Sequence, residues 1–218
     1  MKTKKRKISG YTLIIVFFCI IFLASAGMFG KGSIERYIAQ SRFEDLASEV
    51  LVDAESNDTI HKRDIVRLKE MNPDCTGWIF IEGTDVDYPV MHTPDYPQKY
   101  LYKGFDGKYS EPGTPFLDYE CNLESGNIII YGHNMNNGKM FSDICNYLDD
   151  SFFAEHEIIE FETVEGCFEY RVSEVRHVHQ TDDWYANLEP EDGREYLTLS
   201  TCYGRNDERL IVIAEKIK

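Results

Sequence analysis

Cys202, His133 and Arg209 could together carry out thiol chemistry. Each lies at the edge of a short apolar run that has the pattern of a buried strand. Residues at such strand ends are presented by loops on a rigid sheet, where reactive groups are usually found. Thiol chemistry needs a thiolate, a partner that handles protons, and a donor for the oxyanion that forms when a carbonyl is attacked. The three residue types match these three needs.

The segments around these residues carry a more specific pattern. They read Tyr131-Gly-His-Asn-Met135 and Thr198-Leu-Ser-Thr-Cys202, with an arginine opening the last strand. Earlier in the chain stand Gly77-Trp-Ile, Tyr88-Pro-Val and the pair Tyr100-Leu101. Together these motifs resemble the sortase family, class B branch. The resemblance covers about residues 77–218, and it implies a sortase-type barrel with N-terminal helices.

The resemblance also implies an activity, cysteine transpeptidation. Cys202 would attack the carbonyl after Thr in a surface protein's sorting signal such as Asn-Pro-Gln-Thr-Asn, and an amine of the peptidoglycan precursor would resolve the thioester. His133 would protonate the leaving amine and later deprotonate the incoming one. Arg209 would hold the substrate carbonyl or the oxyanion, since its fixed cation suits a developing negative charge. Arg205 in the same loop competes for this role.

Four further residues are expected to bind the substrate. Leu101, Ser200 and Thr201 match family positions that line the groove, and Tyr203 follows the nucleophile. We expect them to form the floor and rim for the residues before the scissile Thr, with Leu101 as an apolar wall for the proline. The competing interpretation is that Leu101 and Ser200 are ordinary core residues. The polar segment 177–193 resembles a lid that shapes the groove, and it is short for the class.

Two functions of other classes fit part of the pattern. A papain-like cysteine peptidase would hydrolyse its substrate rather than transfer it. In that class the nucleophile usually opens a helix and an Asn or Asp orients the His, whereas Cys202 follows a strand. A non-enzymatic cell-surface binding domain would suit an acidic barrel with aromatic loops. It would leave the constellation of Cys, His and Arg unexplained.

Neither a metal nor a cofactor is predicted. The sequence has no Cys-x-x-Cys and no His-Glu-x-x-His, and His177 and His179 would share a strand face without a visible third ligand. Of the six cysteines, Cys19 lies in an apolar N-terminal segment. The five others are an odd number, so at least one is unpaired unless it pairs between chains. The cysteines expected to be small core residues are Cys75, Cys121, Cys145 and Cys167.

Composition and charge set the class of the protein. The chain has 218 residues, 43% hydrophobic and 28% charged, which suits one globular domain with appendages. The formal net charge is −15, and because basic residues crowd the first seven positions, the body is more acidic still. Such a body does not favour nucleic acid or anionic lipid.

An uncharged run over residues 8–30, with an apolar core at 11–23, predicts a membrane anchor. At about 1.5 Å per residue this helix crosses a bilayer core of about 30 Å. Five basic residues before it place the N-terminus in the cytoplasm and the rest outside. We therefore predict a single-pass protein of the cell membrane with an extracellular catalytic domain. The alternative is a cleaved signal peptide, since Ala24-Ser-Ala26 resembles a cleavage site.

The remaining pattern predicts helices followed by a mainly β domain. Helical spacing of apolar residues indicates helices over 33–54 and 62–71, the second stopped by Pro73, and one more within 140–148. Many short strands with few helices indicate a closed barrel of about eight strands. The expected strands are 77–81, 86–90, 116–118, 128–131, 158–163, 167–175, 197–199 and 210–214. The chain then divides into a basic tail and anchor (1–30), a helical stalk (31–72) and a catalytic barrel (73–218).

Overall fold

A computed structural model of the chain describes residues 10–52, 62–205 and 207–218. It separates into two compact units, Met1–Ile38 and Ala39–Lys218. The helical elements are α1 (Gly10–Glu49), α2 (Ile65–Met71), α3 (Asp150–Glu155) and the 3₁₀ turns η1 (Asp143–Leu148) and η2 (Asp183–Ala186). The strands are β1 (Cys75–Phe80), β2 (Asp87–Met91), β3 (Phe116–Leu117), β4 (Asn127–Tyr131), β5 (Ile158–Thr163), β6 (Gly166–His179), β7 (Tyr196–Cys202) and β8 (Glu208–Lys216).

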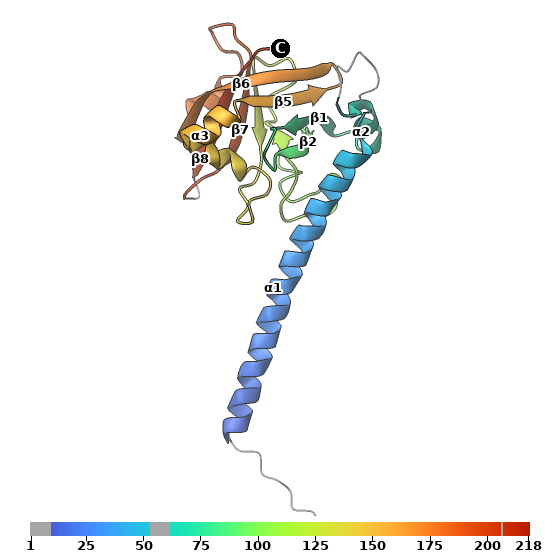
Figure 1. Cartoon of the computed structure of the whole chain (residues 1–218), viewed down its shortest axis with the longest axis vertical. Coiled ribbons are helices and arrows are strands. Elements are labelled where there is room, and N and C mark those ends of the chain that lie inside the picture. Colours follow the sequence, from blue (N-terminus) through green and yellow to red (C-terminus); the bar gives the residue numbers. More distant parts are fainter. Residues whose placement is uncertain (1–9, 53–61, 206) are drawn as a thin grey trace, which may run out of the picture. The chain divides into compact units, whose positions relative to one another are not determined.

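The strands of the described residues close into a barrel in the order β1-β2-β3-β4-β7-β8-β6-β5 (Figure 1). Neighbouring strands are antiparallel except for β2 with β3 and β4 with β7. The predicted closed barrel of about eight strands, mainly β with N-terminal helices, is confirmed. Closure gives each of these described strands a neighbouring strand on both sides.

The parallel pair β4 and β7 decides where the reactive residues meet. Ile128 lies opposite Leu197 and Tyr131 opposite Ser200, so the carboxyl ends of both strands reach the same end of the barrel. The chain after β4 and the last residues of β7 therefore emerge side by side. β8 runs antiparallel to β7 and starts at that same end, which places Arg209 opposite Cys202.

Large apolar side chains fill the barrel. Tyr88, Phe161, Ile130 and Val212 are each 0% exposed, and burying such a side chain stabilises the fold by roughly 1.5–3 kcal/mol. Close packing also explains the glycine of Gly77-Trp-Ile, because a Cβ there would lie 2.5 Å from the Glu162 carbonyl oxygen. The side chains inside the barrel are thus closely packed.

A second, smaller core lies where helices cover β1. Leu46 and Val50, in and just after the last turns of α1, pack with Leu68 of α2 against Cys75 and Trp78. α2 begins at the cap Asp64, whose side chain accepts a hydrogen bond from the Arg67 backbone N–H. It ends at the C-cap Asn72, before the proline, as predicted, but it begins at Ile65 and not at the predicted position 62.

α1 contains two segments that the sequence pattern separates, an apolar run and an amphipathic helix. In the described residues the apolar run 8–30 and the helix predicted over 33–54 belong to one continuous helix, Gly10–Glu49. The predicted end is wrong, because residues 50–52 are described and are not helical, whereas positions 53 and 54 lie outside the described residues. Within the described part of the chain, α1 is the one helix long and apolar enough to cross a membrane, judged by length and composition. A signal sequence meets the same criterion.

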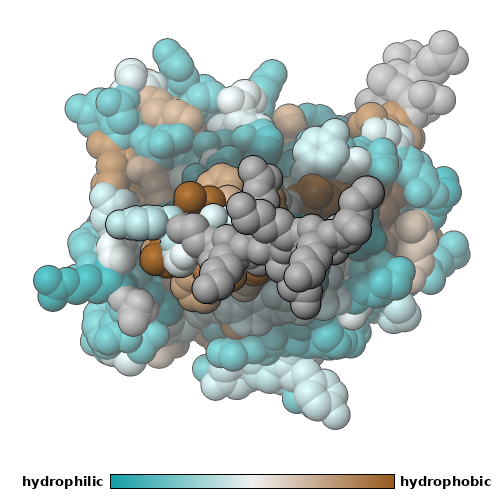
Figure 2. Space-filling view, turned by 90° about the horizontal axis from the view of Figure 1, so that it is seen from below, coloured by the Kyte–Doolittle hydropathy of each residue, from teal (hydrophilic) through white to brown (hydrophobic). Residues whose placement is uncertain are grey.

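In the space-filling view, hydrophilic residues cover much of the visible rim of the molecule (Figure 2).

The helix predicted over 140–148 differs from the observed structure. Met140 has a φ of 60°, which a helix does not allow, so the turn starts only at Asp143 and is a 3₁₀ turn. Asp149 then caps α3, since its side chain accepts hydrogen bonds from the Ser151 and Phe152 backbone N–H groups. The predicted helix is therefore only the shorter 3₁₀ turn η1, and α3, which follows it, was not predicted.

β6 is longer than its sequence pattern indicates. The predicted strand stops at 175, whereas the observed one continues to His179 because β8 pairs with it through Val178 opposite Arg209 and His179 opposite Glu208. His177 and His179 therefore belong to a strand, and the loop before β7 begins later than predicted. This loop contains one short turn, η2.

Candidate active site

His133, Cys202 and Arg209 line one cleft of about 460 Å³ at the end of the barrel where β4 and β7 finish. The three come from the loop after β4, the last position of β7 and the start of β8. Strand pairing across three neighbouring strands brings together residues that are 69 and 7 positions apart in the chain. The cleft is lined by Pro97, Gln98, Leu101, Tyr102, Phe116, Leu117, Asp118, Tyr119, Tyr131, Gly132, His133, Gln180, Tyr185, Ser200, Thr201, Cys202 and Arg209.

Cys202 is exposed although the two residues before it are buried. Its strand is fixed by hydrogen bonds to the glycine before His133: Gly132 N–H donates to the Ser200 carbonyl (3.1 Å), and the Thr201 hydroxyl donates to the Gly132 carbonyl (2.7 Å). Position 132 has room for no side chain, because a Cβ there would lie 2.5 Å from the Phe141 ring. The packing of Phe141 against this position thus requires the glycine of the Tyr-Gly-His motif.

His133 is oriented by a backbone carbonyl. Its Nε2 lies 2.8 Å from the Leu101 carbonyl oxygen. A carbonyl oxygen can only accept, so Nε2 carries the hydrogen and, in the neutral ring, the lone pair is on Nδ1. The ring also packs against Tyr102, with 5.4 Å between ring centroids. Nδ1 is therefore the ring atom that can take up a proton.

A polar network holds the loop that carries Leu101. The Tyr100 hydroxyl donates to the Asp74 carboxylate (2.8 Å), and the Asn72 amide donates to the Tyr100 hydroxyl (2.9 Å). Lys99 also bonds Asp74. Burial alone would raise the pKa of the Asp74 carboxyl, but hydrogen bonds from Lys99 and Tyr100 hold that pKa below its ordinary value. The turn after α2 thus indirectly fixes the carbonyl that orients His133.

Arg209 faces Cys202 across the β7–β8 pair. Its guanidinium donates to the Glu208 carbonyl (2.9 Å) and to the Gln180 side-chain oxygen (3.2 Å), which fixes the plane of the group beside the cleft. Arg205, the competing arginine, is exposed and is not among the residues that line the cleft. The geometry therefore favours Arg209 for the predicted contact with the substrate oxygen.

The structure separates the predicted substrate-binding residues into two groups. Leu101, Ser200 and Thr201 line the cleft. Tyr203 is not among the lining residues, and its ring packs edge-on against His177 at 5.1 Å between centroids. The roles of all four in binding stay predictions.

Sequence reasoning missed Tyr185, which lines the cleft from η2. Its hydroxyl lies 2.8 Å from the Ser200 hydroxyl and its ring stacks on Tyr131 at 6.0 Å. Burial raises the pKa of Tyr185, so the phenol stays neutral and able to donate. The neighbouring Trp184 fixes the turn, because its indole N–H donates to the Thr198 hydroxyl (2.9 Å). The sequence signal that could have identified Tyr185 is the aromatic pair Trp184-Tyr185 within an otherwise polar segment.

The arrangement supplies what acyl transfer through a thiol requires. An exposed thiol, an imidazole and a guanidinium share one cleft. The papain-like alternative does not match this geometry. Cys202 ends a strand instead of opening a helix, and the partner of His133 Nε2 is a backbone carbonyl instead of an Asn or Asp side chain.

Comparisons with known proteins agree with one another. Residues 79–217 match the model of the sortase domain. The chain is 32% identical to sortase B of Listeria monocytogenes over 189 residues, which is 85% of this chain and 74% of the relative. It is 29% identical to sortase B of Staphylococcus aureus over 69% of this chain and 73% of the relative. The Staphylococcus aureus sortase B–substrate complex matches it with a TM-score of 0.69 and 25% identity, covering 87% of this chain and 97% of that chain.

Proposed function

Because the chain belongs to the sortase family, on its class B branch, we propose that Cys202, His133 and Arg209 perform its transpeptidation. The main observation in support of this proposal is that the Cys202 thiol, the His133 imidazole and the Arg209 guanidinium all line one cleft. The family makes the protein a cysteine transpeptidase. We propose, in addition, which residues carry the reaction, which substrates it uses, and how the enzyme is held at the membrane.

In the first half-reaction the Cys202 thiol gives its proton to His133, and its Sγ attacks the carbonyl carbon of Thr in a sorting signal of the Asn-Pro-Gln-Thr-Asn kind. The Arg209 guanidinium stabilises the negative oxygen of the tetrahedral intermediate. When the C–N bond breaks, His133 gives its proton to the leaving amine. The product is a thioester on Cys202.

In the second half-reaction an amine of the peptidoglycan precursor attacks the thioester carbon. His133 takes the proton from that amine, the C–S bond breaks, and a new amide forms. The Cys202 thiolate is regenerated and no cofactor is consumed. Because hydrolysis and transfer share the thioester, the incoming nucleophile alone decides between them.

The apolar part of α1 is proposed to anchor the enzyme in the cell membrane. Its length and composition suit a bilayer span. The five basic residues that precede it favour a cytoplasmic N-terminus and an extracellular barrel. In this proposed topology the cleft is on the side of the membrane where surface proteins and cell-wall precursors occur.

The test is a transfer assay with the full chain in detergent, a sorting peptide, and an amine acceptor such as a short glycine peptide. We expect a peptide–amine product when the acceptor is present and slow hydrolysis when it is absent. Hydrolysis that the acceptor never diverts would identify a peptidase. Binding without any cleavage would contradict the assigned residues altogether.

A further inference from the structure

Asn134, the residue after His133, makes a contact that strand pairing alone does not provide. In a strand, the carbonyls of residues two apart point to the same neighbour. The Ser200 carbonyl accepts from the Gly132 backbone N–H at 3.1 Å. The next carbonyl on that side, of Cys202, accepts at 3.0 Å from the side-chain amide of Asn134.

The side chain of Asn134 therefore takes the place of a backbone donor. β4 ends at Tyr131, so the chain has left the sheet by position 134. The amide extends the pairing of β4 with β7 by one more step, to the residue that carries the thiol. Without it, the described structure gives the Cys202 carbonyl no other donor from the His133 loop.

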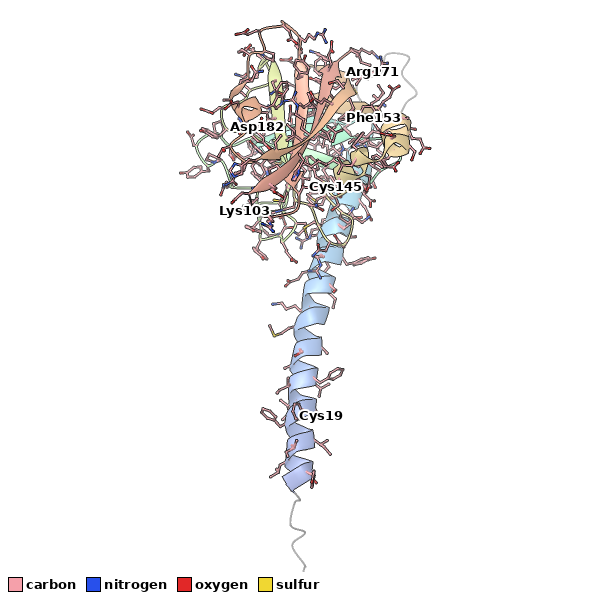
Figure 3. All side chains as sticks on the ribbon, turned by 90° about the vertical axis from the view of Figure 1, so that its left-hand side faces the viewer. Cys19, Lys103, Cys145, Phe153, Arg171 and Asp182 are labelled. Carbon is pink, nitrogen blue, oxygen red and sulfur yellow. The ribbon has the colours of Figure 1, made fainter. Side chains whose placement is uncertain are left out.

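The second hydrogen of the same amide is also used. Asn134 Nδ2 lies 3.3 Å from Cys145 Sγ, a half-buried thiol on η1 (Figure 3). A side-chain amide has two N–H donors, and here one points to the nucleophile's carbonyl and the other to a sulfur that fixes its direction. Burial raises the pKa of Cys145, so this sulfur remains a neutral, weak acceptor.

We infer that Asn134 is a positioning residue that holds the backbone of Cys202 in register with the His133 loop. The expected effect on catalysis rests on the proposed function, whereas the contact between Asn134 and Cys202 does not. Cys202 is exposed and is followed by a loop, so the sheet holds it less firmly than the buried residues before it. A displacement of about 1 Å between reacting groups can cost roughly 10²-fold in rate, and Asn134 restrains that displacement.

The test compares Asn134→Ala and Asn134→Asp with the wild-type full chain in the transfer assay. Asn134→Asp keeps the shape but replaces the donor by an oxygen that repels the carbonyl, so it should be the slower of the two. We expect kcat to fall by roughly 10- to 100-fold, with KM changed less than about threefold and the melting temperature nearly unchanged. Asn136→Asp, the same exchange at an exposed position of the same loop, is the matched control and should behave as wild type.

Cys145→Ala gives a graded intermediate. This variant keeps the hydrogen bond from Asn134 to the Cys202 carbonyl and removes only the contact of the amide with the Cys145 sulfur. We therefore expect kcat to fall less than in Asn134→Ala. Wild-type kcat in both Asn134 variants would overturn the inference. So would an equal loss in Asn136→Asp, or a loss expressed only in KM or melting temperature.

Hydrogen exchange of the segment 200–205 tests the contact independently of turnover. Faster exchange there in Asn134→Ala, and not in Asn136→Asp, is the expected result. If the wild-type chain has no transfer activity, the proposed function fails, while this exchange result still decides whether Asn134 holds Cys202. Unchanged exchange in Asn134→Ala would overturn the positioning role.

Discussion

Two cysteines at strand ends of the same barrel have opposite environments. Cys75 opens β1 and is 1% exposed, with its thiol directed at the Gly77 carbonyl at 3.6 Å, and burial raises its pKa to about 12. Cys202 ends β7 and is exposed in a cleft with His133 and Arg209. A thiol becomes a nucleophile through its position, not its residue type.

Removing the exposed thiol should have the largest effect on activity. Cys202→Ala should abolish turnover, by roughly 10⁴-fold or more, because nothing else in the cleft can form the thioester. The melting temperature should barely change, since the side chain adds little to packing. Both are measured on the same preparation. Retained turnover would remove Cys202 from the mechanism.

Removing the buried thiol should do the reverse. Cys75→Ala should lower the free energy of unfolding by about 1–2 kcal/mol, because it leaves a small cavity in the core with Trp78 and Leu68. Turnover per folded molecule should stay at the wild-type level. Chemical denaturation and the transfer assay measure the two quantities. A specific loss of kcat would mean that the two cysteines are not independent.

Arg209 tests whether the cleft needs a planar cation or only a positive charge. Arg209→Lys should lower kcat by roughly 10²–10³-fold, the usual loss for one oxyanion donor, since an ammonium cannot reproduce the planar fork. Arg205→Ala, an exposed neighbour outside the cleft lining, is the control. If Arg205→Ala is the more damaging change, the roles of the two arginines are exchanged.

Leu101 should affect which peptide is chosen more than how fast it reacts. Leu101→Ala keeps the backbone carbonyl that orients His133 but removes the apolar wall. Discrimination between Pro and Ala in the sorting signal should weaken by about 1–3 kcal/mol, measured as the ratio of kcat/KM values over a peptide panel. An unchanged preference would point to Tyr185 and its loop instead.

The smallest expected effect concerns pH and the support of the Leu101 loop. The folded-state pKa of Asp74 is lowered, so its contribution to stability is present at neutral pH and is lost as pH falls below about 4. Asp74→Asn should therefore be less stable than wild type near pH 7, and the difference should shrink in acid. Unfolding curves at several pH values check this. A difference that grows in acid would have the wrong sign.

The sequence predicts the barrel because its strands are marked locally. Ile128, Ile129 and Ile130 form an apolar run with both faces buried, and the predicted strand 158–163 matches β5. It could not predict the last residues of β6, 176–179, because these mostly polar residues are held by pairing with β8, which is distant in the sequence. Nor could it predict that Met140 has a positive φ, which cuts the expected helix short.

The candidate site was predictable to a similar degree. Family motifs mark His133, Cys202 and Arg209, and the structure brings them to one cleft. The Tyr185 contact depends on how a polar loop folds back onto Ser200. The His133 contact joins a side-chain nitrogen to the Leu101 backbone carbonyl across 32 positions. Neither is encoded in a short motif. Their roles in binding and catalysis stay predictions until tested.

The most direct test of the central claim is the mass of the intact chain after mixing with a sorting peptide and no amine acceptor. The account predicts an added mass equal to that of the peptide fragment ending in Thr less one water, located on Cys202 and absent in Cys202→Ala. Addition of the amine should discharge it and yield the transfer product. An adduct that persists in Cys202→Ala, or one that the amine cannot discharge, would contradict transpeptidation through Cys202.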